Sequence, residues 1–467
     1  MRIGSPMNGR VVVIVGGGFS GSLLALQLLR QSADGLHVYL IEKGDAFGRG
    51  VAYSTRRPDH LLNVRAGNMS AYPDKPAHFQ DWLAVQTGQP ADPFSFAPRW
   101  VYGDYLQAEL RAAAQSAEAA GRLTLVGDEV TEVVRTAGRL VVRLAVGRAM
   151  QADAVVLATG HGAPAEIVSR DSRFSRDPHY VSDPWIKGAL DRIRQDDRVL
   201  LLGSGLTAVD VVTSLDVAGH RGEIVALSRH GQLPRRHMRS AGSAIAWERQ
   251  PGEPLSQSLR RFRRQADRLS DWRRAFDGLR EQIQDVWASL GEVERRRALR
   301  HLRPWWDVHR HRMAPEIAIR IDRGIAEGRL RIVAGRMLSL RAEIGGVTIT
   351  WRPRTHTSVR ADRTEWVINC TGPEGDPRRS GNEVVRRLIE AGLARPDPLC
   401  LGLDVDLDGR LLGLNGDRQD RLYGLGPLTR GALWEVTAVP DIRLQASRLA
   451  ARIATDIAEA PQSAIAS

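Results

Sequence analysis

Two short stretches of the sequence share one layout, and this duplication constrains the fold more than any other feature. Residues 11–29 read VVVIVGGGFSGSLLALQLL, and residues 198–215 read RVLLLGSGLTAVDVVTSL. Each stretch has an apolar run, a glycine cluster with GxGxx(G/A) spacing, and then apolar residues with helical periodicity. A strand, glycine turn and helix in this order are typical of dinucleotide-binding α/β units. The sequence therefore predicts two such units in one chain.

The first unit has the complete set of dinucleotide-binding features. Gly16, Gly18 and Gly21 have the spacing for a tight turn, close approach of a pyrophosphate and close helix packing. The unpaired amides and the positive dipole end of the following helix favour phosphate. Glu42 ends the next apolar run, HVYLIEK, where a carboxylate accepts hydrogen bonds from ribose hydroxyls. These features together predict a bound adenine dinucleotide.

The second unit differs at the position of the acidic residue. Gly203, Gly205 and Ala208 form GxGxxA, and the next strand, EIVALSRH, places Ser228 and Arg229 where the first unit has Glu42. An acid repels a ribose 2′-phosphate, whereas serine and arginine bind it through charge-assisted hydrogen bonds. This difference favours NADP(H) over NAD(H). The alternative is that Arg229 is only a solvated residue at a strand end.

Two dinucleotides in one chain suggest electron transfer between them. One coenzyme delivers hydride, and a flavin receives it and passes electrons on, while the protein aligns the two rings. We therefore expect FAD in the first unit and NADPH in the second.

Two later strand ends, AVVLATGHGAP and WVINCTGPEGD, suit the last strand of each unit, and Gly160 in the first is a cofactor-contact candidate. The predicted fold is α/β, with two Rossmann-like domains, the second inserted in the first, and a helical insertion. The expected domains are residues 1–165 (FAD-binding, first part), 195–235 with 305–372 (NADP-binding), 236–304 (a helical cap) and 373–467 (return to the FAD-binding domain).

Composition excludes several other classes of protein. The 467 residues carry a formal net charge of +12, but of the 66 basic residues only Lys43, Lys75 and Lys187 are lysines. The arginine runs have interleaved acids and no recognition motif, so nucleic-acid binding is not expected. Cys370 and Cys400 are too far apart in sequence for a CxxC pair. No apolar run approaches a membrane span of about 18 residues, and we expect a cytoplasmic protein.

The helical insertion ends in RHLRPWWDVHRHRMAP, which is rich in basic and aromatic residues. Asp307, His309 and His311 do not predict a metal site, because further ligands are not evident and neighbouring arginines repel a cation. Arginine binds planar carboxylates through two parallel hydrogen bonds. We therefore expect an anionic substrate, with contact candidates Arg310, Arg312 and Arg430, against the alternative that these residues pair with acids or face solvent.

Several motifs together resemble a known family. GGGFSG, GRGVAYST, HLLNVRAGNMSA, LLLGSGLTAVDVV, LSRHGQLPRRH and LYGLGPLTRGALWEVTAVPDIRLQA are similar to those of bacterial FAD/NAD(P)-binding proteins related to amino-acid N-hydroxylating and other class B flavin monooxygenases. The resemblance runs over nearly the whole chain. It is specific for the cofactor framework and spans at least two substrate classes, amino acids and urate.

The resemblance also implies further cofactor contacts. Pro427 stands where many such flavoproteins have the acid of a Gly-Asp motif for the ribityl chain, so Thr429, Arg430 or Asp441 are the alternatives for that role. The contacts implied by the resemblance are a flavin-side loop from Gly48 through Gly50 to Tyr53, Asn63 and Met69 near the isoalloxazine, Val130 at the adenine, and Gly426 in the ribityl loop.

Three reactions remain open at this stage. The favoured one is a single-component monooxygenase, in which NADPH reduces FAD, O₂ adds to form a C4a-hydroperoxyflavin, and a small substrate takes one oxygen. No catalytic residue is predicted, because the reactive group belongs to the cofactor. The alternatives are a flavin reductase or dehydrogenase that uses another acceptor and a flavin-binding protein without turnover.

Overall fold

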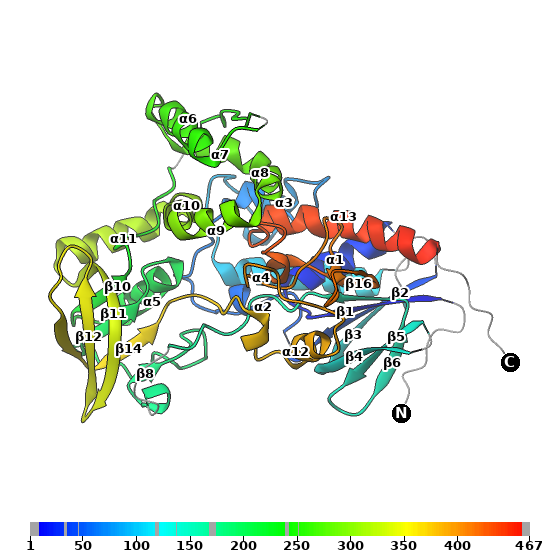
Figure 1. The fold of residues 1–467 in the computed structure, drawn as a ribbon, viewed down its shortest axis with the longest axis horizontal. Helices are drawn as coiled ribbons and strands as arrows, with labels where there is room; N and C mark the ends of the chain where they lie inside the picture. The colour runs from blue at the N-terminus through cyan, green and yellow to red at the C-terminus, as the bar shows by residue number, and fades with distance from the viewer. Residues whose placement is uncertain are drawn as a thin grey trace.

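The computed structural model shows two α/β domains and an insertion of helices (Figure 1). It describes residues 9–31, 35–44, 46–116, 121–136, 138–167, 174–238, 242–250 and 252–459. Among these residues, no helix is both long and apolar enough to span a membrane.

The first sheet has six strands in the order β15-β16-β7-β1-β2-β3. All neighbouring strands pair in parallel except β15 with β16, so the carboxyl ends of β16, β7, β1, β2 and β3 lie at one edge. The sheet combines the two ends of the chain, which confirms that the second domain is inserted in the first. The strands are β1 (Arg10–Val15), β2 (Leu36–Glu42), β3 (Leu123–Gly127), β7 (Ala154–Leu157), β15 (Arg410–Leu412) and β16 (Arg418–Gly424).

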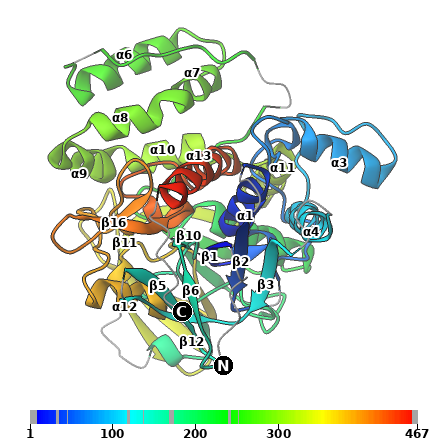
Figure 2. The ribbon, with the colours of Figure 1, turned by 90° about the vertical axis from the view of Figure 1, so that its right-hand side faces the viewer.

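Alternate residues of β1 form two different cores, as expected for a strand buried on both faces. Val12 and Ile14 pack against helices, whereas Val11, Val13 and Val15 pack against a three-stranded antiparallel sheet, β4-β5-β6. Helices α1 and α13 lie side by side on the first face in both views (Figures 1 and 2). One face carries α1 (Phe19–Gln31), α4 (Arg99–Gln115) and α13 (Val439–Ala458), and the other carries β4 (Val130–Thr136), β5 (Arg139–Leu144), β6 (Ala149–Ala152) and α12 (Glu383–Glu390). The short elements α2 (Gly50–Tyr53), η1 (Ala66–Asn68), α3 (His78–Thr87), η4 (Pro377–Arg379) and η5 (Gly426–Thr429) complete this domain.

The second sheet has seven strands in the order β13-β12-β11-β10-β9-β14-β8. β11, β10, β9, β14 and β8 are parallel, and β12 and β13 extend the sheet as antiparallel strands. Its elements are η2 (Phe174–Arg176), β8 (Tyr180–Val181), β9 (Val199–Leu202), α5 (Leu206–Val217), β10 (Ile224–Ser228), α11 (Pro315–Ala326), β11 (Leu330–Glu343), β12 (Gly346–Pro353), β13 (Arg360–Thr364) and β14 (Trp366–Asn369). Two Rossmann-like domains were predicted, and the two sheets confirm them.

The helical insertion lies between β10 and α11, and its first helices, α6 and α7, project away from both sheets at the top of Figure 1. Trp287 packs with Leu290 and with Trp434 of the first domain, so the insertion is anchored on the C-terminal part of the chain. The expected boundary between residues 304 and 305 falls inside α10. The insertion comprises α6 (Leu255–Asp267), α7 (Arg273–Leu279), η3 (Arg280–Gln282), α8 (Ile283–Ser289), α9 (Glu292–His301) and α10 (Arg303–Arg310).

Candidate functional site

The first glycine turn joins β1 to α1 at the carboxyl edge of the first sheet. Gly16 has φ +105°, and a Cβ there would lie 2.4 Å from the Ala158 carbonyl oxygen; a Cβ on Gly21 would lie 1.9 Å from the Gly16 oxygen. A Cβ on Gly18 would meet only Gly50, at 3.3 Å from its Cα. Gly16 and Gly21 are therefore required by the fold itself, whereas Gly18 borders the space in front of the helix.

Glu42 lies beside this turn, as the spacing predicts. Its Oε2 accepts a hydrogen bond from the Gly17 amide at 2.8 Å, and its Oε1 accepts one from the Gly44 amide at 3.4 Å. The carboxylate at the end of β2 thus reaches the start of the phosphate turn, which is where it could accept ribose hydroxyls.

The structure brings the Gly48–Tyr53 loop against the same turn. The Gly48 amide donates to the Gly17 carbonyl at 2.8 Å, and Gly50 faces Gly18. The phenol of Tyr53 packs edge-on against Phe19 of α1, and burial raises the pKa of Tyr53.

The other predicted flavin contacts are distributed around this edge. Gly160 follows β7 and Gly426 follows β16, which puts both at the carboxyl edge of the sheet. The Asn63 carbonyl accepts a hydrogen bond from His237, at the start of the helical insertion. Met69 is 1% exposed in the helical core, and Val130 is 5% exposed in the core between the two sheets. The structure thus gathers the loop glycines at the edge but places the side chains of Met69 and Val130 in packed cores.

The loop after β16 is held by its own hydrogen bonds. The Thr429 hydroxyl is fully buried and donates to the Gly426 carbonyl at 2.9 Å. Asp441 pairs with Arg280 at 3.0 Å and with Arg310 at 3.3 Å. Of the three alternatives for the missing ribityl acid, Thr429 and Asp441 already have protein partners.

The second glycine turn joins β9 to α5. Gly203 has φ +119°, and a Cβ there would lie 2.3 Å from the Cys370 carbonyl oxygen, whereas Gly205 has open space in front of it. The Ser204 hydroxyl donates to Ser228 Oγ at 2.8 Å, which ties the turn to the end of β10. The Arg229 side chain is exposed beside it.

Polar contacts between the domains hold the two turns in one orientation. Arg99, at the start of α4, pairs with Asp210 of α5 at 2.8 Å. The His60 ring makes a hydrogen bond between Nε2 and the Ser214 hydroxyl, at 2.8 Å. Burial raises the pKa of Asp210, although the charge of Arg99 opposes this shift.

The three predicted substrate arginines differ in their partners. Arg310 pairs with Glu435 at 2.9 Å as well as with Asp441, and Arg312 pairs with Asp277 at 2.9 Å. Arg430 lies over the Trp434 ring, 4.7 Å from its centroid, and makes no ion pair with a carboxylate in the described part of the chain. Burial lowers the pKa of the Arg430 guanidinium, as expected for a desolvated cation.

Sequence reasoning missed His161, which follows Gly160. The side chain is exposed, yet desolvation by the surrounding protein and the charges of Arg430 and His311 lower its pKa to about 4. The TGHG sequence was the available signal.

Glu435 was also missed, and its backbone is unusual. It has φ +69° and is 2% exposed, and its Oε1 accepts a hydrogen bond from Trp306 Nε1 at 2.6 Å. Burial disfavours its charge, but Arg310 and His311 outweigh burial and lower the pKa of Glu435. A left-handed non-glycine residue costs about 1–3 kcal/mol and persists only where its surroundings hold it. No local sequence signal marks this conformation.

The Asp307, His309 and His311 triplet is used in local contacts. Asp307 accepts a hydrogen bond from Arg303 at 3.3 Å, and His309 Nδ1 lies 2.7 Å from the Trp305 carbonyl oxygen. Within the described ranges, no group of three or more His, Cys, Asp or Glu residues is arranged to hold a metal ion.

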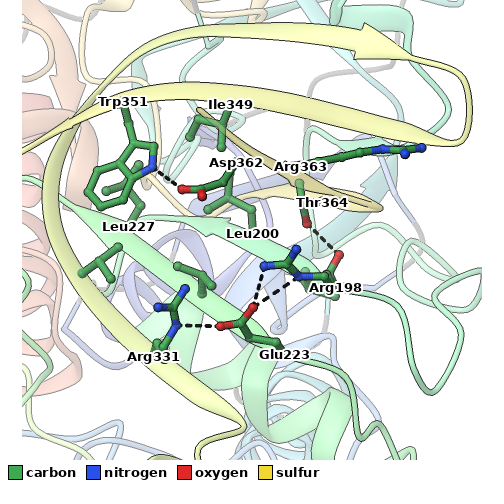
Figure 3. Close-up of a pocket in the computed structure, with 13 residues that line it drawn as sticks. Arg198, Leu200, Glu223, Leu227, Arg331, Ile349, Trp351, Asp362, Arg363 and Thr364 are labelled. Carbon is green, nitrogen blue, oxygen red and sulfur yellow. Dashed lines mark hydrogen bonds and ion pairs between the residues drawn. The ribbon is translucent and has the colours of Figure 1, made fainter. Parts of the chain in front are cut away.

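A small cavity lies at the opposite, amino end of the second sheet (Figure 3). Its volume is about 30 Å³, enough for about one water molecule. Glu223 pairs there with Arg198 at 2.7 Å and Arg331 at 2.6 Å, and Trp351 Nε1 donates to Asp362. The cavity is a packing gap at the end of the sheet away from the second glycine turn, and Glu223 compensates the charges of Arg198 and Arg331 in its lining.

Comparison with known proteins agrees with this arrangement. Residues 13–162 match the family model described as FAD-NAD(P)-binding, and no curated protein sequence matches the chain. An ornithine N-hydroxylase from Kutzneria sp. 744, solved with reduced FAD, NADP⁺ and L-ornithine, is 16% identical with a TM-score of 0.64 over 95% of this chain and 99% of that one. The cadaverine monooxygenase DfoA from Erwinia amylovora, bound to FAD, is 14% identical with a TM-score of 0.65 over 95% and 94%. Thioredoxin reductase from Lactococcus lactis is 12% identical with a TM-score of 0.53 over 97% and 100%.

The fold and the two glycine turns define the class: this chain has the two-domain Rossmann fold of FAD- and NAD(P)-dependent flavoenzymes. Residues 13–162 form an FAD/NAD(P)-binding domain, which confirms the cofactor prediction at that level. The expected relation to the N-hydroxylating flavin monooxygenases is confirmed in the fold.

Proposed function

We propose that this protein is an FAD-dependent, NADPH-using monooxygenase that hydroxylates a small anionic substrate. The observation that carries the proposal is the presence of two glycine turns, each at the carboxyl edge of its own parallel sheet, in domains linked by the Arg99–Asp210 ion pair. When bound, FAD accepts hydride from NADPH and activates oxygen. The protein binds, orients and shields the reacting groups.

The residues of the first turn fit an FAD pyrophosphate and ribose. Gly18 leaves the front of α1 open, the first amides of α1 are available to phosphate, and Glu42 stands at the end of β2. The second turn fits NADPH in the same way, with Gly205 open and Ser228 and Arg229 at the end of β10. The fold of the Kutzneria hydroxylase holds both coenzymes and its substrate together, which supports this assignment.

The cysteines separate this proposal from disulfide reduction. Both are free; Cys370 is buried beneath the second glycine turn, and Cys400 lies beside Arg378, with its Sγ 3.4 Å from the guanidinium. A flavin disulfide reductase needs a redox pair of cysteines within reach of each other. The likeness to thioredoxin reductase is therefore one of fold, and oxygen is the better acceptor.

Arg430 is the residue that we assign to the substrate. It comes from the loop after β16, His161 comes from the end of β7, and His311 follows α10, so three separate elements meet at one place. The charges of Arg310 and Arg312 are already compensated by acidic residues. Arg430 is therefore the candidate that can form an ion pair with a substrate carboxylate. Glu435 holds Arg310 and Trp306 next to it.

The test is NADPH oxidation by the FAD-loaded protein in air and under nitrogen, with aspartate, ornithine, lysine and urate as probes. The proposal predicts oxidation that needs oxygen and is stimulated by at least one carboxylate or urate probe. Steady oxidation under nitrogen with a dye acceptor, unaffected by every probe, would indicate a reductase instead. Absence of flavin reduction by NADPH would indicate a binding protein.

Substitution of Arg430 tests the substrate assignment. Loss of a charge-assisted hydrogen bond costs about 1.5–3 kcal/mol, so Arg430→Gln should raise the KM of the stimulating probe about tenfold or more, with unchanged FAD content. Arg296, an exposed residue paired with Glu292, offers the matched control Arg296→Gln. An equal KM in both variants would remove Arg430 from the site.

A further inference from the structure

A basic pocket opens at the carboxyl end of the second sheet, beyond Ser228. Its volume is about 340 Å³, and most of its lining comes from β11, β12 and the turn that follows β12. The lining residues are Arg229, Gly335, Arg336, Arg352, Pro353, Arg354, His356 and Thr357.

The charges of this pocket are unbalanced. Its lining has four arginines and no Asp or Glu, and all four arginine side chains are exposed. Arg229, Arg336 and Arg352 make no ion pair with a carboxylate anywhere in the described ranges. The same β11–β12 hairpin carries paired arginines elsewhere: Arg331 pairs with Glu223 at 2.6 Å and Arg341 with Glu343 at 2.7 Å. The lack of acids is therefore specific to the part of the hairpin that lies next to the carboxyl end of β10.

The strand register places like charges opposite each other. Arg336 of β11 is the direct partner of Arg352 in β12, next to the pair Gly335 and Pro353. Like charges directly opposite across antiparallel strands destabilise a sheet. An anion bound between them would relieve this repulsion.

The hairpin is joined to the turn that was predicted to select the coenzyme. Ser228 is the register partner of Ala334, and the Gly231 backbone packs on Ala334, where a Cβ would lie 2.9 Å from the Ala334 Cβ. Arg354 donates to the Arg229 carbonyl at 3.4 Å and to His230 Nδ1. Burial and the charges of Arg354 and Arg229 lower the pKa of His230, consistent with a positive field.

We propose that the basic pocket binds the 2′-phosphate of a phosphorylated adenosine. The phosphate would be held by four arginines, Arg336, Arg352 and Arg354 of the hairpin and Arg229 after β10. This inference rests on the proposed function for the identity of the coenzyme and extends it to residues outside the β10 turn. A dianionic phosphate accepts several charge-assisted hydrogen bonds, and guanidinium forks from two strands surround it better than one arginine does. The hairpin, rather than β10 alone, then determines the preference for NADPH.

Binding of two nucleotide fragments tests the site without turnover. Calorimetry would compare adenosine 2′,5′-bisphosphate with adenosine 5′-phosphate on the FAD-loaded protein and on Arg336→Gln, Arg352→Gln and their double variant. Each single variant should weaken the bisphosphate about tenfold and leave the monophosphate within about twofold. The wild-type preference should fall steeply with salt.

Arg341→Gln is the matched control, because Arg341 is exposed on the same hairpin but paired with Glu343. The inference is overturned if Arg336→Gln and Arg352→Gln bind the bisphosphate as tightly as Arg341→Gln does. It is also overturned if the wild type shows no preference between the two fragments. Arg336→Lys keeps the charge and should recover part of the affinity, which distinguishes lost binding from lost folding. Selective bisphosphate binding without NADPH oxidation would leave this site standing and refute the proposed function alone.

Discussion

At the residue scale, the glycines of the first phosphate turn do not share one role. Gly16 and Gly21 have backbone oxygens where a Cβ would lie, at 2.4 Å and 1.9 Å, whereas Gly18 has only Gly50 at 3.3 Å. The spacing predicted different roles for the three: a tight turn, close approach of a pyrophosphate and close helix packing. It could not give the neighbours that each position meets, because Ala158 and Gly50 come from other parts of the chain.

Replacement of Gly18 should therefore affect cofactor retention more than stability. Gly18→Ala should keep an unfolding midpoint near that of the wild type but retain little FAD, because its Cβ stands where the pyrophosphate must approach. Flavin absorbance after gel filtration and urea denaturation are the measurements. Gly21→Ala should instead fail to fold stably. A Gly18→Ala protein with a full complement of FAD would contradict the assignment.

Replacement of Arg312 should affect stability, whereas replacement of Arg430 should affect substrate binding. Its side chain is 4% exposed, pairs with Asp277 and lies over Trp272. Arg312→Ala should lower the free energy of unfolding by about 1–3 kcal/mol, because a buried, hydrogen-bonded charge is lost. The loss should not be larger, because its partner Asp277 is partly exposed to water. Denaturant titration measures this loss. A fully stable Arg312→Ala protein with a raised substrate KM would return Arg312 to the substrate site.

At the scale of elements, prediction succeeded where the elements of a unit follow each other along the chain. The β1-α1-β2 and β9-α5-β10 units each combine a strand, a glycine turn and a helix in one short stretch, so local pattern was sufficient. The ion pairs of the insertion were not predictable in this way. Arg310 meets Glu435, and Trp287 meets Trp434, only because the insertion folds back over the C-terminal segment.

The anchoring of the helical insertion depends on Trp287 of α8. Its ring stacks on Trp434 with centroids 4.5 Å apart, and its Nε1 donates to the Gly431 carbonyl at 2.9 Å. Trp287→Ala should cost about 3–5 kcal/mol of this packing. We expect faster proteolysis within residues 242–310 than in the wild type. We also expect NADPH oxidation that depends less on the presence of substrate. Limited proteolysis would check this, and an unchanged cleavage pattern would exclude the anchor.

His237 connects the insertion to the Asn63 loop and should make stability depend on pH. Burial, with the charge of Arg312, lowers its pKa to about 3. Since the folded pKa is below the unfolded value of about 6.5, its stabilising contribution is complete above about pH 6.5 and is lost as the pH falls toward 3. The slope from one such group is at most about 1.4 kcal/mol per pH unit.

Replacement by a residue that does not titrate isolates this effect. His237→Gln should reduce the difference in unfolding free energy between about pH 5 and about pH 7.5, as measured by urea denaturation. His356, which is exposed, supplies the control His356→Gln with an unchanged difference. Identical pH profiles for His237→Gln and wild type would show that His237 does not carry the dependence.

At the scale of the whole molecule, the relative orientation of the two domains rests on polar contacts at α5. Removing one partner of a buried ion pair leaves an uncompensated charge and costs about 3–5 kcal/mol, whereas removing both costs less. Arg99→Met should therefore destabilise strongly, and Arg99→Met with Asp210→Asn should recover much of the loss. A double-mutant cycle in denaturant measures the coupling. Additive losses would mean that the pair does not join the domains.

The two-domain order was predictable from the sequence, because each glycine turn marks a domain, but the Arg99–Asp210 contact was not. Neither residue carries a motif signal for the other, and their pairing follows only from how the two sheets meet. The same holds for the basic pocket, where Arg336 and Arg352 meet through strand register. Sequence patterns give the units, and the packing between units gives the site.

Incorporation of oxygen from ¹⁸O₂ would distinguish a monooxygenase from a reductase that uses another acceptor. The probe that best stimulates NADPH oxidation would be incubated with FAD-loaded protein under labelled oxygen, and the product examined by mass spectrometry. We expect one ¹⁸O atom in the product under labelled oxygen and none after incubation in labelled water. An unlabelled probe recovered unchanged while NADPH is consumed and the electrons pass to another acceptor would contradict this expectation.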